Sequence, residues 1–195
     1  MSNVDGVILA AGRSSRMGLV NKVKAVLAGR TLLQHAVANL APQVNRLLVN
    51  GDAELCGNKA VSDKLEGFKG PLMGLYSALS SEQLSSAEYL MMVPCDGPFI
   101  PNNLVTSLHK VIAQTDADIA CVRYQGFAQP TFSLWHKRVM PAVEQALLVN
   151  KNGGFKPLLE DLKSVYLDWP EQGINPFFNI NTPDDLAEAE RLLCR

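Results

Sequence analysis

The sequence is poor in the residues that build metal centres and disulfide frameworks. Its 195 residues include only four cysteines and three histidines. The cysteines, Cys56, Cys95, Cys121 and Cys194, form no C-x-x-C pair and have no histidine at metal-ligand spacing. This pattern argues against a zinc site and against a dithiol redox motif. We therefore expect four reduced thiols.

An excess of one charge and a long apolar run are also missing. Lysine and arginine number 18 against 19 aspartates and glutamates, so the chain has no general attraction to nucleic acid or to anionic membrane. No apolar run is long enough for a membrane span, and the start MSNVDG has neither the basic nor the apolar region of a signal peptide. We expect a cytoplasmic protein without nucleic-acid or membrane partners, in which any anion binding is local.

Apolar residues, by contrast, are abundant. They make up 47% of the chain, enough for one core in a single domain over residues 1–195. Short apolar runs alternate with helical patterns, which is typical of the α/β class with a mostly parallel twisted sheet flanked by helices. The predicted strands are 5–10, 46–50, 88–93 and 118–122, and the predicted helices are 31–40, 74–81, 101–113 and 183–193. Pro101 and Pro183 suit first helical turns, with Thr182 as a helix cap.

The stretch ILAAGRSSRMGLVNK, residues 8–22, runs directly on from the first predicted strand and contains no acidic residue. In an open parallel sheet, ligands bind beyond the carboxyl ends of the strands. Its small residues would let a ligand approach the backbone, and Arg13, Arg16, Lys22 and Lys24 could neutralise several negative charges. Its glycines fit neither the P-loop nor the dinucleotide fingerprint. A polyphosphate site is one interpretation, and a solvated surface loop is the other.

A single acid follows another predicted strand, in VPCDGPFIP at residues 93–101. Proline stops the strand, so Asp96 lies near its carboxyl end. Magnesium is usually held by one or two carboxylates together with substrate phosphates, which makes Asp96 a candidate metal ligand. A turn-forming or capping role is the alternative for this residue.

Together these motifs resemble the nucleotidyltransferases that act on the molybdenum cofactor, most closely the molybdenum cofactor guanylyltransferases. The resemblance rests on five stretches in order along nearly the whole chain: LAAGRSSRMGLVNK at 9–22, GPLMGLYSAL at 70–79, PCDGPFIP at 94–101, QPTFSLW at 129–135 and FNINTPDDL at 178–186. It implies a Rossmann-like nucleotidyltransferase fold. The nucleotide would bind in the half at about 1–100 and the acceptor in the half at about 101–195.

The reaction that the resemblance implies is transfer of GMP from GTP to the terminal phosphate of molybdopterin, with Mg2+ and release of pyrophosphate. Guanylyltransferases of the family usually read LAGG and carry Asp before the lysine, whereas this chain has Ala11 and Asn21. LAAG and SSRMG look like the cytidylyltransferase relatives, so CMP transfer to the same cofactor, or nucleotide transfer to a sugar phosphate, stays open. A non-catalytic nucleotide-binding regulator or cofactor-delivery partner is the alternative of another class. Other cofactor-biosynthesis proteins and acceptor molybdoenzymes are further expected partners.

The resemblance also implies roles for individual residues. Those expected at the nucleotide are Leu9, Ala10, Ala11 and Gly12 at base and sugar, Lys22 at the phosphates, and Asn50 and Asp63 at the guanosine. Arg16, Lys22 and Asp96 would be catalytic, with Asp96 holding the metal. Asn179 and Asn181 would lie near the pterin or its phosphate, although both precede a helix and also suit capping. We expect His35, His109 and His136 to be structural or surface residues.

Overall fold

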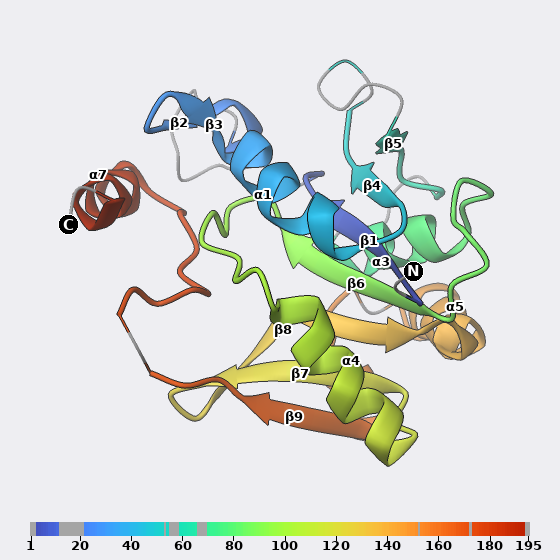
Figure 1. Ribbon diagram of the computed structural model, residues 1–195. Coiled ribbons are helices and arrows are strands. Elements are labelled where there is room, and N and C mark those ends of the chain that lie inside the picture. Colours follow the sequence, from blue (N-terminus) through green and yellow to red (C-terminus); the bar gives the residue numbers. More distant parts are fainter. Residues whose placement is uncertain are drawn as a thin grey trace.

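The fold is built around one seven-stranded sheet (Figure 1). The computed structural model describes residues 3–11, 22–52, 54, 59–65, 70–151, 153–171 and 173–193. In sheet order the strands are β5 (Ala60–Val61), β4 (Leu47–Asn50), β1 (Val4–Leu9), β6 (Tyr89–Pro94), β8 (Phe127–His136), β7 (Ile119–Tyr124) and β9 (Ser164–Asp168). All of them run in parallel except β8, which is antiparallel to both of its neighbours.

Helices cover both faces of this sheet (Figure 1). One face carries α1 (Leu32–Leu40) and α4 (Leu104–Thr115), and the other carries α3 (Pro71–Leu79), α5 (Met140–Leu148) and α6 (Lys156–Asp161). The last helix, α7 (Pro183–Leu193), packs near the short hairpin β2 (Val26–Leu27) and β3 (Arg30–Thr31). The short 3-10 turns are η1 (Lys22–Lys24), η2 (Ala41–Gln43) and η4 (Lys137–Val139). Within the described ranges, no helix is long and apolar enough to cross a membrane.

Alternating side chains of the strands divide the core into two layers. In β1, Ile8 belongs to the cluster under α1 and α4, whereas Val7 belongs to the cluster under α3, α5 and α6. In β6, Met91 and Met92 are divided in the same way. Successive residues of a strand point to opposite faces, and a parallel strand covered on both faces reads as an unbroken apolar run. For this reason the strands could be predicted from continuous apolar stretches of the sequence.

The predicted elements agree with the structure in type, and two helix starts differ. All four predicted strands are present within two residues of their predicted ends, and the last helix spans residues 183–193 as predicted. The predicted helix 74–81 begins earlier, because Pro71 starts its first turn. The prediction that Pro101 opens a helix is wrong: α4 begins at Leu104, and the Pro101 carbonyl accepts the Leu104 N–H (3.2 Å) in the preceding turn. Among the described elements, β8, β9, α5 and α6 were not predicted, and neither were the two-residue strands β2, β3 and β5 or the 3-10 turns.

A bulge interrupts the longest strand. Cys121 of β7 faces Ser133 of β8, but the next residue, Val122, faces Gln129, so residues 130–132 are extra on β8. Pro130 has no N–H to donate and is therefore suited to a bulge. The Ser133 hydroxyl donates to the Pro130 carbonyl (2.6 Å) and closes the bulge. As a result the Phe132 side chain is fully buried in the core layer under α1 and α4.

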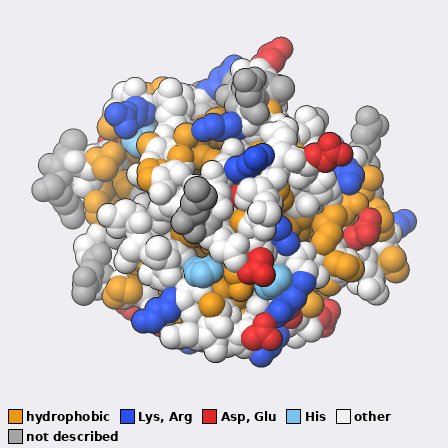
Figure 2. Space-filling model, turned by 45° about the vertical axis from the view of Figure 1, so that its right-hand side comes forward, with side chains coloured by type: hydrophobic (Ala, Val, Ile, Leu, Met, Phe, Trp, Pro, Cys, Tyr) orange, Lys and Arg blue, Asp and Glu red, His pale blue; other side chains and the backbone are white. Residues whose placement is uncertain are grey.

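A buried carboxylate near the start of β1 is paired with a partly buried lysine. Asp5 is fully buried and accepts hydrogen bonds from Lys137 Nζ (2.9 Å), from the Ser85 N–H (2.9 Å) and from the Ser85 hydroxyl (2.7 Å). Lys137 also donates to the Ser85 carbonyl (3.0 Å). A buried carboxylate needs a cation and several hydrogen bonds to offset its lost hydration, and Asp5 has both. On the molecular surface seen in Figure 2, acidic and basic side chains are interspersed.

Candidate functional site

The carboxyl ends of β4, β1 and β6 meet at one edge of the sheet. Leu9, the last residue of β1, is paired with Asn50 on one side and with Pro94 on the other. The backbone continues the pairing beyond the strands, because the Ala10 N–H donates to the Asn50 carbonyl (2.7 Å) and the Cys95 N–H donates to the Leu9 carbonyl (3.0 Å). Leu9, Ala10, Asn50 and Asp96 are thus brought together as predicted. Ala11, the next described residue, is exposed.

Asn50 is the buried polar group at this edge. Its side-chain amide donates to the Asp63 carboxylate (2.9 Å) and to the Val61 carbonyl (3.1 Å), which fixes the strand end of β4 against β5. Asp63 is exposed beside it. An amide buried with two acceptors holds one orientation, so Asp63 is held with part of its carboxylate facing outward. The structure therefore joins two residues that the sequence separates by thirteen positions.

Helix α3 packs directly on this edge through Gly74. A Cβ at this position would lie 2.7 Å from Leu9 Cδ2 and closer still to Asn50 Oδ1. Real Cβ atoms do not approach other atoms so closely, so glycine is required by the contact. Gly70 precedes the first turn of the helix, and its φ of 109° is in the region that favours glycine. The Leu72 N–H in that first turn donates to the Gly153 carbonyl (3.2 Å). The segment before α6 therefore contacts the first turn of α3.

Asp96 lies in the turn that follows β6 and is half-buried. Its backbone carbonyl accepts the Ile180 N–H (2.9 Å), which fastens the segment before α7 to this turn. Two residues further on, the Pro98 carbonyl accepts from the Asn39 amide on α1 (2.8 Å). The turn that carries Asp96 is thus held from two sides by hydrogen bonds to its backbone.

Asn179 brings a polar group from the far end of the chain to the same turn. Its Oδ1 atom is buried and, among the described residues, has no hydrogen-bond partner. A Cβ built on Gly97 would lie 3.4 Å from this oxygen. A buried oxygen without a donor costs about 1–3 kcal/mol and is a rare feature that calls for an explanation. A ligand at this site that supplies a donor or a cation would provide it.

Asn181 has a different environment from Asn179. Its backbone N–H donates to the Asp185 carboxylate (2.9 Å), as does the Thr182 N–H (2.9 Å), while Thr182 Oγ1 accepts the Asp185 N–H (3.1 Å). These bonds cap α7, which confirms Thr182 as its cap. The Asn181 side-chain amide is 3.4 Å from the Asn179 carbonyl. The cap is therefore formed by Thr182 and Asp185, and Asn181 contributes its backbone N–H to it.

The basic stretch falls largely outside the described residues. Gly12, Arg13 and Arg16 lie there, so their predicted roles stay predictions. Lys22 enters the structure as the first backbone position of η1, and Lys24 in the same turn is exposed. The turn η1 is the next described element after β1 in the sequence.

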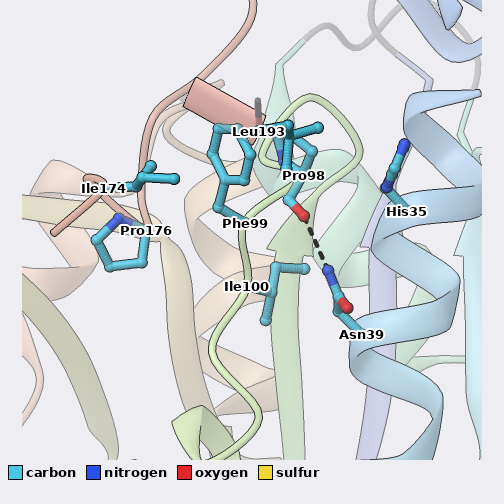
Figure 3. Close-up of a pocket in the computed structure, with 8 residues that line it drawn as sticks. All are labelled: His35, Asn39, Pro98, Phe99, Ile100, Ile174, Pro176 and Leu193. Carbon is cyan, nitrogen blue, oxygen red and sulfur yellow. Dashed lines mark hydrogen bonds between the residues drawn. The ribbon is translucent and has the colours of Figure 1, made fainter. Parts of the chain in front are cut away.

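An open groove of about 410 Å3 lies beside the turn after β6 (Figure 3). It is lined by His35, Asn39, Pro98, Phe99, Ile100, Ile174, Pro176 and Leu193. Asn39 holds the Pro98 carbonyl, as above, and His35 Nε2 lies 2.8 Å from the Leu27 carbonyl. These contacts agree with the structural role predicted for His35. The volume is within the range typical of small-molecule sites, and the lining is mainly apolar.

Thiols offer no alternative chemistry in the described part of the site. Burial raises the pKa of the Cys121 thiol to about 12, so it stays protonated at neutral pH and is a poor nucleophile. Cys95, which follows β6, is buried as well. No group of three or more histidine, cysteine or acidic side chains suited to a metal occurs in the described ranges. A cation at Asp96 would need ligands of other kinds.

Sequence reasoning missed the residues that build the site without touching a ligand. Gly74 and Gly97 lie within the motifs GPLMG and PCDGPF, but only the packing explains why they are glycines. Gly153 and Phe132 were missed because their contacts are made between segments far apart in sequence. No local pattern signals such contacts.

Comparison with known proteins gives a consistent result. The model of the family described as "MobA-like NTP transferase domain" matches residues 6–165. A relative named molybdenum cofactor guanylyltransferase, from Rhodopseudomonas palustris (strain BisB5), is 35% identical, covering 97% of this chain and 93% of its own length. Its counterpart from Vibrio cholerae is 33% identical, with 96% and 91% covered.

Solved structures show the same fold. The molybdopterin-guanine dinucleotide biosynthesis protein A from Archaeoglobus fulgidus superposes with a TM-score of 0.82 at 21% identity, covering 97% of this chain and 98% of that one. A CMP:2-keto-3-deoxy-manno-octonic acid synthetase complexed with CTP superposes with a TM-score of 0.74 at 14% identity, with 99% of each chain covered. At these identities the likeness concerns the fold alone.

Proposed function

The chain belongs to the MobA-like NTP transferase family, and on that premise we propose that it transfers GMP from GTP to the terminal phosphate of molybdopterin. The products are the guanine dinucleotide form of the cofactor and pyrophosphate. The observation that carries the proposal is the meeting of Asn50–Asp63, Asp96 and Asn179 at one sheet edge in a chain with full-length guanylyltransferase relatives. The chain is a nucleotidyltransferase.

The acceptor phosphate needs no base to become a nucleophile. The second pKa of a phosphate monoester is about 6, so most of the group is a dianion at neutral pH. The reaction is therefore limited by repulsion between two anions and by the charge that develops on pyrophosphate. Positioned cations reduce both, and we assign this role to the side chains of Lys22 and Arg16, with Arg13 as a further candidate.

The nucleotide would lie across the ends of β1 and β4. Backbone groups of Leu9–Gly12 would face the base and sugar, although the Ala10 N–H is already donated to Asn50. The Asp63 carboxylate uses one oxygen for Asn50 and has capacity for further donors, which suits the N–H groups of guanine or the hydroxyls of ribose. Asn50 would then act by holding Asp63 and the backbone in place.

A divalent cation fits the oxygen atoms at the end of β6. Asp96 supplies a carboxylate, and the orphan Oδ1 of Asn179 lies beside the next residue, Gly97. Magnesium favours oxygen ligands and takes few from protein, with phosphate oxygens and water as the rest. When bound, it would offset the negative charge of the phosphates. Asp96 would hold it, and Asn179 would present its oxygen to the cation or to a donor of the acceptor.

The acceptor half would receive molybdopterin between Asp96 and the segment that carries Asn179 and Asn181. The groove in Figure 3 adjoins this segment through Ile174 and Pro176. A flat pterin has apolar faces and polar edges, and such a group suits an apolar groove with a few polar side chains. The enzyme would work in the cytoplasm, with other cofactor-biosynthesis proteins and acceptor molybdoenzymes as its partners.

The test is to incubate the protein with molybdopterin, Mg2+ and one labelled nucleoside triphosphate at a time. We expect a dinucleotide product and pyrophosphate from GTP and at most traces from CTP, ATP or UTP. Product from CTP in preference to GTP would overturn the guanylyl assignment and favour the reading of Ala11 as a cytidylyl feature. GTP binding without pyrophosphate release, with fresh molybdopterin present, would favour a regulator or delivery protein instead.

A further inference from the structure

Residues 177–180 follow a turn, in which the Phe178 N–H donates to the Asn175 carbonyl (3.3 Å), and their side chains lie in two environments. Phe177 is buried in the core layer under α1 and α4, whereas Phe178 and Ile180 pack into the small cluster with the β2–β3 hairpin and α7. Asn179 Oδ1 lies near the Phe132 ring that Phe177 contacts, because a Cβ on Gly97 would be 3.4 Å from this oxygen and 2.6 Å from Phe132 Cζ. The side chain of Phe177 therefore bears directly on where the orphan oxygen of Asn179 lies.

Phe177 is the centre of an aromatic cluster drawn from three other parts of the acceptor half. Its ring is 5.8 Å from that of Tyr124 on β7, 5.1 Å from that of Phe132 on β8 and 5.5 Å from that of Trp169 after β9. All three pairs are edge-on, which is a favoured geometry for aromatic rings. Three ring contacts from different elements fix the position and the tilt of Phe177.

One ring of this cluster also contacts the turn of Asp96. A Cβ on Gly97 would lie 2.6 Å from Phe132 Cζ, so this turn packs on the Phe132 ring without a side chain between them. The bulge at residues 130–132 brings Phe132 to this place. Phe132 thus contacts Gly97 on one side and Phe177 on the other. Its ring therefore sets the distance between the turn that carries Asp96 and the segment that carries Asn179.

We propose that Phe177 is a positioning residue for the acceptor: through Phe132 it sets where Asn179 lies relative to Asp96, without touching either substrate. The inference rests on the proposed function, because it assigns Asn179 to the acceptor side of that site. A small displacement of a positioned group is costly in reactions that depend on alignment of two substrates. GTP, bound at the ends of β1 and β4, does not depend on this cluster.

The test compares Phe177→Leu with Phe155→Leu. Both phenylalanines are almost fully buried, at 3% and 5% exposure. Phe155 belongs to the opposite core layer, where its ring contacts that of Trp135 at 5.7 Å. We expect Phe177→Leu to raise the KM for molybdopterin roughly tenfold and to leave the Kd for GTP with Mg2+ within about twofold. Phe155→Leu should lower the melting temperature similarly and leave the molybdopterin KM unchanged.

Hydrogen exchange provides a measurement that needs no turnover. The Ile180 N–H, bonded to the Asp96 carbonyl, should exchange at least about tenfold faster in Phe177→Leu and at the parent rate in Phe155→Leu. An unchanged molybdopterin KM, or a GTP Kd that rises by the same factor, would overturn the proposal. If the parent makes no product from GTP and molybdopterin, the proposed function fails, whereas the exchange rate still decides whether Phe177 holds this segment.

Discussion

At the scale of single residues, Asp96 is half-buried in a turn whose backbone is held by hydrogen bonds. Its carbonyl is bonded to the Ile180 N–H, and Pro98 nearby is bonded to Asn39, so two hydrogen bonds to the backbone hold the turn. We expect a substitution that keeps the volume of the Asp96 side chain to leave these backbone bonds in place. Function and stability can therefore be separated by mutation here.

Asp96→Asn should lower kcat for GMP transfer by about 100-fold or more, because the charge that holds the cation is lost while the volume is kept. The melting temperature should stay within about 2 °C of the parent, since the turn's backbone bonds remain. Asp161→Asn, at an exposed aspartate on α6, is the control and should retain full activity. Near-normal magnesium-dependent turnover in Asp96→Asn would remove Asp96 from the mechanism.

His136 links the stability of the protein to pH. Its ring stacks edge-on with that of Tyr89 (5.0 Å), and its Nδ1 accepts the Arg138 N–H (3.0 Å). Burial lowers the pKa of His136, and the charge of Arg138 lowers it further, against the weaker influence of nearby carboxylates. Because the folded state binds this proton less tightly than the unfolded state, protonation favours unfolding.

The stabilising contribution of His136 should be complete above its unfolded pKa of about 6.5 and lost as pH falls through its lower folded pKa. His136→Asn keeps an acceptor for the Arg138 N–H but does not titrate. Its free energy of unfolding, measured by urea denaturation between pH 5 and 8, should therefore fall less towards acid than that of the parent. Parallel curves for the two proteins would contradict this assignment.

At the scale of elements, the contact of α3 with the ends of β1 and β4 depends on one missing side chain. An alanine in a helix interior is normally more stabilising than a glycine by about 1 kcal/mol. Gly74→Ala should instead destabilise by about 1–3 kcal/mol, because its Cβ would push against Asn50 and Leu9. We also expect the Kd for GTP to rise in Gly74→Ala, because the added Cβ would displace Asn50 and, through it, Asp63.

Gly6→Ala provides the comparison for Gly74→Ala. Its Cβ would meet side-chain atoms of Val44 and Leu47 at 3.2 Å, and these can yield more readily than a strand end. We expect a smaller loss of stability and an unchanged GTP Kd, measured by urea denaturation and equilibrium binding. Equal effects of the two substitutions on the GTP Kd would show that α3 does not shape the nucleotide site through Gly74.

The elements that could be predicted from the sequence are those with a continuous apolar run or a clear helix-start signal. The four predicted strands are parallel and covered on both faces, so they read as apolar runs, and α7 has a proline and a cap at its start. β8 was missed because its sequence FAQPTFSLWH mixes polar residues with a proline, and a bulge breaks its alternation. The edge strand β9 is only half-buried and alternates weakly. The late start of α4 was missed because a turn uses the proline.

At the scale of the whole molecule, Asp5 and Lys137 join residues 132 positions apart. Lys137→Met should lower the free energy of unfolding by about 3–5 kcal/mol, because it leaves a carboxylate buried without its cation. Asp5→Asn combined with Lys137→Met should recover part of this loss, measured by urea denaturation. Lys110→Met, at an exposed lysine of α4, should change stability by less than about 0.5 kcal/mol. A loss in Lys110→Met equal to that in Lys137→Met would argue against a specific role of the pair.

The position of several candidate site residues at the sheet edge could be predicted from the sequence, whereas their mutual contacts could not. Leu9, Asn50 and Asp96 follow apolar strands, so their place at the carboxyl edge follows from parallel topology alone. The bond from Asn50 to Asp63 and the approach of Asn179 to Gly97 depend on how distant segments pack. The family resemblance identified these residues as candidates, but their contacts with one another are seen only in the folded structure.

The antiparallel strand β8 sets the order in which this chain can finish folding during its synthesis. β6 remains an edge strand until β8 pairs with it, and His136 lies 42 residues after Pro94. At ribosomal rates of about 5–20 residues per second, β6 stays open for roughly 2–8 seconds. Asp5 lies 132 residues before Lys137 and waits for it for roughly 7–26 seconds. Strand β8 must then enter between β6 and β7, which precedes it in the chain. The newly made N-terminal half is therefore an apolar sheet with an unpaired edge, the form in which chaperones and aggregation compete for a nascent protein.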